Sequence, residues 1–410
     1  MTDYYFQELF AERIGGANYG KSNEIYKFEK IKRAKRQAIK DFPDRPLIDF
    51  GIGENDAMAD ENVRRVMARE INQPENRGYA DNGCLEFKQA AARFMERNFQ
   101  VKLDPLSEIN HAIGSKPALA MIPCLFINPN DVTLLTVPGY PVAGTHTQYC
   151  GGSVYQLPLT QENNFFPDFN SVPDDVFSKT KLLVLNYPNS PTGQIATIEF
   201  YEKVIKLAKK HKFVVIQDAA HLMLTYRNPP LSFLQVPGAR DVGVEIHSLS
   251  KGWNMIGWRI AWVCGNERIV QAFADVKDNN DSGQFLAIQK AAIAALDDPN
   301  IPNETNKKYY RRLEKLVATL RPFGFECDLP GGTYFLYVKA PKGLADGIKF
   351  NNAEEVSQYL IREHSICTVP WDNAGSFLRF SVTYSAEDET AEDELMFQFS
   401  ERLGQITFEF

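Results

Sequence analysis

The sequence predicts an α/β protein: an open, mainly parallel sheet flanked by helices, together with a smaller α+β domain. The chain has 410 residues, and at roughly 100–200 residues per domain this length indicates two or three units. Apolar residues make up 44% and charged residues 24% of the chain, which is typical of globular proteins with a substantial core. From about residue 47, short apolar runs alternate with longer amphipathic ones, the rhythm of βα units stacked into one sheet.

Several of the expected strands are continuous apolar runs rich in β-branched residues, as in strands buried on both faces of a parallel sheet. In chain order they are LIDFGIG (47–53), NHAIGS (110–115), DVTLLTVP (131–138), KLLVLNYP (181–188), KFVVIQDAA (212–220), EIHSLSK (245–251) and RIAWVCG (259–265). Helical stretches lie between them, for example GCLEFKQAAARFMERNF (83–99) and TIEFYEKVIKLAKKHK (197–212).

The pattern divides the chain into three segments. Residues 1–46 form a polar N-terminal arm that ends in a charged helix and contributes to the small domain. Residues 47–296 form the large domain. After residue 296 a long charged helix (303–324) leads into the strand-like runs FLYVKAP (335–341) and SFLRFSVT (376–383). Residues 297–410 are therefore expected to form the small C-terminal domain.

Composition excludes several classes of function. The formal net charge of −7, from 45 basic and 52 acidic residues, argues against nucleic acid or an anionic membrane as a partner. No stretch approaches the roughly 20 apolar residues that a membrane helix needs, and the start of the chain lacks a signal-peptide pattern. The six cysteines form no CxxC pair and are expected in the core of a cytoplasmic protein. The six histidines form no metal-ligand cluster, and Gly51-Ile52-Gly53 lacks the third glycine, at Asp56, of a dinucleotide-binding loop.

The segment Ser248-Leu249-Ser250-Lys251 carries the clearest chemical signal. Ligands of open α/β sheets bind beyond the carboxyl ends of the strands, and this segment ends an apolar run. Arg259 follows eight residues after Lys251. A lysine among hydroxyls, trailed by an arginine, suits a covalent bond to an aldehyde cofactor beside a phosphate site. The alternative is a solvated lysine at a helix start and an arginine paired with a surface carboxylate.

Two further candidates each have a structural alternative. Asp218 ends the run FVVIQDAAH, where a carboxylate would keep the nitrogen of a pyridine ring protonated or would cap a helix. Gly114-Ser115-Lys116 opens a helical stretch, where N–H groups suit a phosphate or where Ser115 is an ordinary cap.

Two other candidates involve an aromatic ring and an arginine. Tyr140 lies in the turn VPGYPVAG, where its ring would stack on a planar cofactor or pack against the protein. Arg379 lies in an otherwise apolar strand, and a buried arginine needs an anion, either a substrate carboxylate or a structural salt bridge.

Eight motifs together resemble, in order and over nearly the whole chain, the fold-type I aminotransferases that use pyridoxal phosphate. They are GIGEND (51–56), RGYADNGCLEFKQA (77–90), GSKPAL (114–119), PGYP (138–141), NYPNSPTG (186–193), QDAAH (217–221), SLSKGWNMIGWR (248–259) and SFLRFS (376–381). The chain is most similar to the LL-diaminopimelate aminotransferases, through IYKFEKIKR (25–33), ENNFFPDF (162–169) and the first, second and last motifs. The resemblance implies a mainly parallel seven-stranded sheet, bound pyridoxal 5'-phosphate and a homodimer with shared active sites.

The resemblance also implies a role for each candidate. Lys251 would form the imine with the cofactor, Asp218 would pair with its ring nitrogen, and Tyr140 would stack on the ring. The phosphate would be surrounded by Ser115, Lys116, Ser248, Ser250 and Arg259, and Tyr79 would reach it from the neighbouring subunit. Arg379 would hold the α-carboxylate of the substrate, while Tyr26, Gly53 and Lys116 would line its pocket.

Three positions depart from the family pattern. The family usually has asparagine directly before Pro-Thr-Gly, where this chain has Ser190, with Asn189 one place earlier. It usually has tyrosine three residues after the aspartate, where this chain has His221. Both family residues contact the phenolic oxygen of the cofactor, so Asn189, Ser190 and His221 are taken as cofactor-binding, and the changes are expected to alter the imine pKa. An asparagine of the diaminopimelate enzymes has Ser282 as its nearest counterpart, expected to bind substrate.

The activity expected is transfer of an amino group between LL-2,6-diaminopimelate, with tetrahydrodipicolinate as its product, and 2-oxoglutarate, which becomes glutamate. This exchange belongs to lysine and cell-wall precursor biosynthesis. Small amino and keto acids would be the only ligands besides the cofactor. One alternative is a broader aminotransferase that uses aspartate, alanine or aromatic amino acids. The other is a cofactor-binding regulator or scaffold without turnover.

Overall fold

A seven-stranded sheet forms the centre of the chain, with strand order β2-β8-β7-β6-β5-β3-β4. The computed structural model describes residues 3–21 and 27–410. The strands are β2 (Ile109–Ala112), β3 (Val132–Val137), β4 (Ser153–Pro158), β5 (Thr180–Asn186), β6 (Val214–Asp218), β7 (Gly243–Ser248) and β8 (Ala261–Gly265). β8 runs antiparallel to β2 and β7, and the other neighbours pair in parallel. This architecture confirms the predicted fold class.

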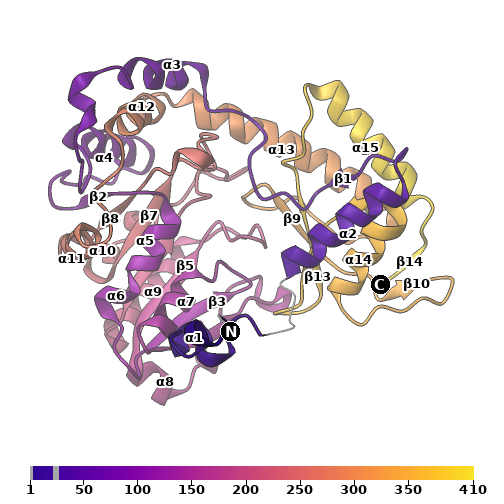
Figure 1. Cartoon of the computed structure of the whole chain (residues 1–410), viewed down its shortest axis with the longest axis horizontal. Helices are drawn as coiled ribbons and strands as arrows, with labels where there is room; N and C mark the ends of the chain where they lie inside the picture. The colour runs from indigo at the N-terminus through magenta and orange to yellow at the C-terminus, as the bar shows by residue number, and fades with distance from the viewer. Residues whose placement is uncertain (1–2, 22–26) are drawn as a thin grey trace.

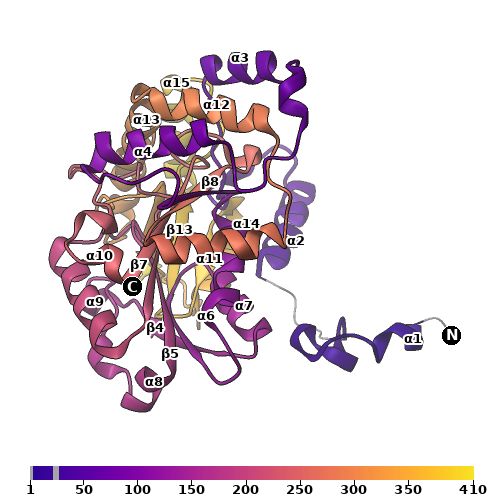
Figure 2. The same cartoon turned by 90° about the vertical axis from the view of Figure 1, so that its left-hand side faces the viewer.

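Helices cover both faces of this sheet. They are α3 (Glu61–Glu70), α4 (Leu85–Phe99), α5 (Ser115–Met121), α6 (Pro123–Phe126), α7 (Val142–Tyr149), α8 (Asp174–Lys179), α9 (Ile198–His211), α10 (Ala239–Val242), α11 (Glu267–Asp278) and α12 (Leu286–Asp297). Alternate residues of one strand enter opposite cores: Leu183 and Leu185 of β5 join the core with α4, α9 and α12, whereas Leu182 and Val184 join the core with α5, α7 and α11. Figure 2 shows α9 and α10 on one side of the strands and α6 and α7 on the other. The strands therefore read as unbroken apolar runs.

A separate core lies in the C-terminal part of the chain (Figure 1). It contains α13 (Asn300–Leu320), α14 (Ala353–His364), α15 (Glu389–Leu403) and an antiparallel sheet of order β12-β13-β9. The strands of that sheet are β9 (Phe335–Lys339), β12 (Val369–Trp371) and β13 (Phe377–Ser381). Two short pairs join β1 (Ile48–Asp49) to β11 (Ile366–Cys367) and β10 (Gly343–Leu344) to β14 (Phe408–Glu409).

Helix α2 (Lys27–Asp41) belongs to the same part of the molecule. Ile31, Ala34 and Ala38 form a small apolar cluster with Ile361 of α14 and with Cys367 and Val369. Before it, α1 (Asp3–Gln7), η1 (Glu12–Ile14) and η2 (Gly16–Asn18) extend away from the rest of the chain (Figure 2). No helix within 3–21 and 27–410 is long and apolar enough to cross a membrane.

One expected strand lies outside the central sheet, and one strand of that sheet was not expected. The run LIDFGIG contains a strand, but β1 pairs with β11 outside the seven-stranded sheet, and Ile48 and Phe50 join the C-terminal core. The seventh strand is β4, an edge strand with mostly exposed or half-buried residues, so its sequence lacks the apolar run of a central strand.

Among the cysteines, Cys124 is exposed rather than in the core. The domain boundaries remain a proposal, with α12 ending at Asp297 and α13 beginning at Asn300.

Candidate active site

The candidate residues gather where the central strands end. The last residues of β5, β6 and β7 are Asn186, Asp218 and Ser248, and in the parallel register Asn186 lies opposite Asp218. Lys251 follows β7 by three residues and lies in a turn. The carboxyl ends of parallel strands meet at one edge of a sheet, so these polar groups share that edge.

Lys251 is held against a loop that comes from the start of the chain. Its Nζ donates a hydrogen bond to the carbonyl oxygen of Gly53 at 3.0 Å and lies 5.3 Å from the ring centroid of Tyr334. The Tyr334 hydroxyl donates to the same carbonyl at 2.8 Å. Asn55 Nδ2 donates to the Lys251 carbonyl and to Asn254 Oδ1, at 2.7 and 2.6 Å. Lys251 is therefore half-buried and fixed, and the alternative of a solvated lysine at a helix start is wrong.

Asp218 is a buried carboxylate whose lost hydration is replaced by few hydrogen bonds. It accepts a hydrogen bond from the Ala220 N–H at 3.1 Å, and Asn186 Nδ2 donates to its backbone carbonyl at 2.9 Å. A turn rather than a helix follows the residue, so it caps no helix. Burial raises the pKa of Asp218 to about 6, against the Ala220 hydrogen bond and the charges of His247 and Lys251. A buried carboxylate of this kind favours a cationic partner.

An anion cradle lies at the start of α5. Gly114 has φ 89° and ψ 156°, and a Cβ there would overlap the Arg259 guanidinium, whose Cζ would lie 2.7 Å away. The guanidinium therefore packs against the backbone that leads into Ser115. Arg259 Nη1 donates to the Ile256 carbonyl at 2.9 Å. Over the described residues, no carboxylate lies within 4.0 Å of Arg259, so the alternative of a surface ion pair is wrong.

Two serine hydroxyls lie at the end of β7, the strand that α5 packs against. Ser248 Oγ donates to Ser250 Oγ at 3.0 Å, and the Ser250 N–H donates to Ser248 Oγ at 3.2 Å. Both serines are buried. Hydroxyls, an arginine without an acid and the N–H groups of a helix start form a donor set suited to a phosphate.

Asn189, Ser190 and His221 surround the carboxyl ends of β5 and β6. Asn189 is fully buried, and its Oδ1 accepts hydrogen bonds from the Thr192 N–H and hydroxyl at 3.2 and 2.7 Å. The Ser190 N–H donates to Asn186 Oδ1 at 2.9 Å. Within the described ranges, Asn189 Nδ2 and His221 Nδ1 are buried atoms without a hydrogen-bond partner. Burial and the charges of Lys251 and Arg379 hold the pKa of His221 well below its usual value, so the ring is neutral at pH 7.

Arg379 lies on β13 and reaches the same loop as Lys251. Its Nη2 donates to the Gly51 carbonyl at 3.1 Å, and its guanidinium lies 4.2 Å from the ring centroid of Phe335. The Arg379 side chain is buried, and burial lowers its pKa to about 10. No carboxylate of the described chain lies within 4.0 Å of it, so the structural salt bridge alternative is wrong. Arg379 and Lys251 thus bind carbonyl oxygens two residues apart, at Gly51 and Gly53.

Four predicted residues are exposed, and a fifth lies outside the described residues. Tyr79 is 86% exposed, and its neighbour Ala80 donates an N–H to the carbonyl of Ser282 at 3.3 Å. Tyr79 and the exposed Ser282 therefore occupy one surface together. Tyr140 is 43% exposed in the turn after β3. Lys116 is exposed on the first turn of α5, and Tyr26 lies outside the described residues.

Two site residues escape the sequence prediction. Asn55 holds the Lys251 backbone and Tyr334 shares the Gly53 carbonyl with Lys251. Asn55 stands in the motif GIGEND, so its place there was a usable signal. Tyr334 follows Gly331-Gly332, where a Cβ on Gly332 would lie 2.6 Å from Pro188. That tight packing brings Tyr334 to the site, but no sequence pattern reveals it.

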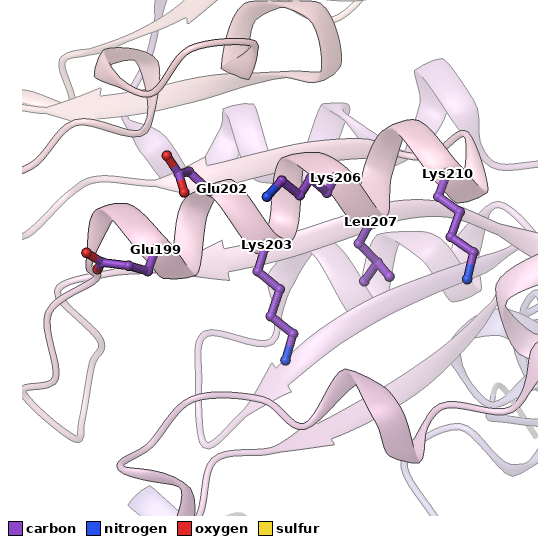
Figure 3. A pocket seen from close by; sticks show the side chains of 6 residues that line it. All are labelled: Glu199, Glu202, Lys203, Lys206, Leu207 and Lys210. Atoms are coloured by element: carbon purple, nitrogen blue, oxygen red, sulfur yellow. The ribbon is translucent and has the colours of Figure 1, made fainter.

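A surface hollow of about 340 Å³ lies elsewhere, on α9 (Figure 3). Its lining is Glu199, Glu202, Lys203, Lys206, Leu207 and Lys210, all from that one helix. None of these is a predicted site residue.

Comparisons with known proteins agree with this geometry. The family model for aminotransferase class I and II matches residues 45–393. The chain is 54% identical to a protein of Methanocaldococcus jannaschii named LL-diaminopimelate aminotransferase, over 99% of each chain. It is 53% identical to a Methanococcus maripaludis protein of the same name, again over 99% of each. Among solved structures, substrate-bound BacF of Bacillus subtilis superposes with a TM-score of 0.84 at 28% identity, covering 95% of this chain and 97% of that one.

Proposed function

Because this chain belongs to the class I and II aminotransferases, we propose that it exchanges an amino group between LL-2,6-diaminopimelate and 2-oxoglutarate. The full-length similarity to the two proteins named LL-diaminopimelate aminotransferase supports this choice of substrate. One observation carries the reaction class. Lys251 Nζ donates a hydrogen bond to the carbonyl of Gly53, and Arg379 Nη2 donates one to the carbonyl of Gly51. An amine and a group that can bind a carboxylate therefore contact the same short loop.

The site fits pyridoxal phosphate by its donor set. Arg259 against Gly114, with Ser115, Ser248 and Ser250, would hold the phosphate. Lys116 would contribute from the first turn of α5, and the Tyr140 ring would lie against the cofactor ring. When bound, the cofactor supplies an aldehyde that takes the amino group and a ring that withdraws electrons from the substrate's Cα.

The residues of the chain have separate tasks. Arg379 grips the α-carboxylate and so orients the substrate. Lys251 Nζ moves the proton at Cα, acting as a general base and then as a general acid. Asp218 keeps the ring nitrogen protonated, and such a cation would offset the burial of its carboxylate. Asn189 and His221 carry buried atoms without partners among the described residues, and these, with Ser190, would be available to the cofactor's phenolic oxygen.

We further propose a cytoplasmic homodimer with shared sites. Tyr79 and Ser282 share an exposed surface, as expected of residues that complete the partner's site. Tyr26 would line the substrate pocket. Light scattering on the purified protein tests the dimer. Mixing inactive Lys251→Ala and Tyr79→Ala variants, with subunit exchange, should restore one intact site per hybrid; no recovery despite exchange would contradict shared sites.

The activity test uses the purified protein with pyridoxal phosphate. We expect a visible absorbance band that disappears in Lys251→Ala. We then expect glutamate formation from 2-oxoglutarate with LL-diaminopimelate to exceed that with aspartate, alanine or aromatic donors. Preference for another donor by orders of magnitude would support the broader aminotransferase instead. Cofactor binding without turnover of any donor would support the regulator or scaffold.

A further inference from the structure

Lys27 is a second cation without an acidic partner on the same side of the small sheet as Arg379. It begins α2, which lies beside α14 in Figure 1. Its Nζ lies 3.5 Å from the ring centroid of Trp371 and donates to the Pro370 carbonyl at 3.4 Å. Within 3–21 and 27–410, no carboxylate lies within 4.0 Å of this amine.

The two nearby acids are engaged elsewhere. Glu354 pairs with Lys30 at 2.5 Å. Asp372 accepts hydrogen bonds from the N–H groups of Ala353 and Glu354 and from the Ser376 hydroxyl, at 2.8, 3.3 and 2.9 Å. Burial, and next the charge of Arg379, lower the pKa of Lys27 to about 8, although Asp372 and Glu354 act in the opposite direction. Lys27 thus shares an electrostatic environment with Arg379.

Strand register places the two cations on one face of the β12-β13-β9 sheet. Val369 pairs with Arg379 and Trp371 with Phe377. Directly opposed side chains, and those two residues along, point to the same face. Trp371, whose ring contacts the Lys27 amine, therefore points to the same face of the sheet as Arg379. Trp371 is displaced from Arg379 by one strand across the sheet and by two residues, about 7 Å, along it.

The face of the sheet around Arg379 is aromatic and offers hydrogen-bond donors. Tyr337 pairs with Arg379 across β9 and β13, and its ring stacks on Phe377 with centroids 4.4 Å apart. Among the described residues, Tyr337 Oη and Arg379 Nε are buried atoms without partners. Lys27 and Arg379, neither of which has a carboxylate within 4.0 Å among the described residues, together with these donors suit a ligand with two carboxylates.

We propose that Lys27 binds the second carboxylate of a dicarboxylic amino or keto acid whose first carboxylate is held by Arg379. This inference rests on the proposed function and specifies how the far end of the substrate is recognised. Lys27 is then a specificity residue, since it contacts the substrate away from the reacting carbon. The class of substrate is an α-amino or α-keto acid with a distal carboxylate, and LL-diaminopimelate and 2-oxoglutarate both belong to it.

The test compares LL-diaminopimelate with L-lysine, which differs from it only by lacking the distal carboxylate. Lys27→Met removes the charge and keeps the apolar stem, Lys27→Arg keeps the charge, and Lys32→Met, at an exposed position of the same helix, is the control. We expect kcat/KM for LL-diaminopimelate to fall about 10- to 100-fold in Lys27→Met, as for a lost charge-assisted hydrogen bond. Activity with L-lysine and the values for Lys32→Met should stay within about twofold of the parent protein.

A binding measurement supplies a readout besides turnover. Calorimetry of the cofactor-loaded protein should show weaker binding of heptanedioate in Lys27→Met, substantial recovery in Lys27→Arg and unchanged binding of hexanoate. Unchanged heptanedioate binding, or equal losses for both acids in a variant with a normal circular dichroism spectrum, would overturn the proposal. If the parent protein transaminates no donor, the proposed function fails, and the heptanedioate comparison still decides the role of Lys27.

Discussion

Replacing Gly114 with alanine is expected to weaken both the fold and the phosphate cradle. At φ 89° and ψ 156° the backbone is in a region that is essentially restricted to glycine, and a side chain there costs about 1–3 kcal/mol. The new Cβ would also lie 2.7 Å from Arg259 Cζ, so the guanidinium must move. Losing its bond to the phosphate would remove about 1.5–3 kcal/mol of binding, or roughly 10- to 100-fold in cofactor affinity.

The assay is a titration of the apo protein with pyridoxal phosphate, followed by visible absorbance, alongside urea unfolding. Gly257→Ala is the matched control, because a Cβ at Gly257 meets no atom within 4 Å and its φ is not positive. Gly257 also lies only two residues before Arg259. We expect Gly257→Ala to keep the parent affinity. Equal affinities and unfolding free energies for both variants would refute the reasoning about Gly114.

Three further predictions concern single side chains. Although burial acts to raise it, hydrogen bonds from Arg311 and Arg312 hold the pKa of Glu392 at about 2, below the ordinary value of 4.5. The folded-state pKa is depressed, so this carboxylate stabilises the protein above pH 4.5 and loses its contribution as pH falls toward 2. The loss is on the order of 3 kcal/mol, and urea unfolding between pH 6 and 3 should show a smaller pH dependence for Glu392→Gln. Arg379→Met should reduce kcat/KM for all amino acids by at least about tenfold through weaker carboxylate binding, and an unchanged KM would contradict its role. His221→Phe should leave the unfolding free energy within about 1 kcal/mol, since Nδ1 has no partner among the described residues, yet shift the pH midpoint of the visible band; a constant midpoint would exclude contact with the cofactor.

The central sheet was predictable because its strands are buried on both faces. Six of the seven expected runs are strands of that sheet, from β2 to β8 with β4 missing. β4 was not predicted, because it is an edge strand whose exposed positions are polar and interrupt the apolar run. LIDFGIG has the same apolar character as a central strand, and only its pairing with β11 in the other core separates it from the sheet. Local hydropathy reports burial, but it does not say against which sheet a strand is buried.

The site was predictable where the motif itself carries the chemistry. Lys251, Arg259 and Asp218 stand within short segments whose residue types are informative together. Tyr334 and Lys27 were not predicted as site residues, because their contacts are with residues far away in the chain, Gly53 and Trp371. Such contacts arise from the way β9, β12 and α2 pack, and a single sequence gives no pattern for them.

The carbonyls of Gly51 and Gly53 also hold two side chains of the candidate site in order. Arg379 and Lys251 donate to these neutral acceptors. On the proposed function, Arg379 would exchange its carbonyl for a substrate carboxylate, which strengthens the hydrogen bond and breaks no ion pair among the described residues. Asp56, a few residues further along, accepts hydrogen bonds from Lys308, Tyr309 and Arg312 at 2.6, 3.0 and 3.1 Å. The loop is thereby anchored to α13, so the order of Arg379 and Lys251 in the candidate site depends on a helix that contributes none of the predicted site residues.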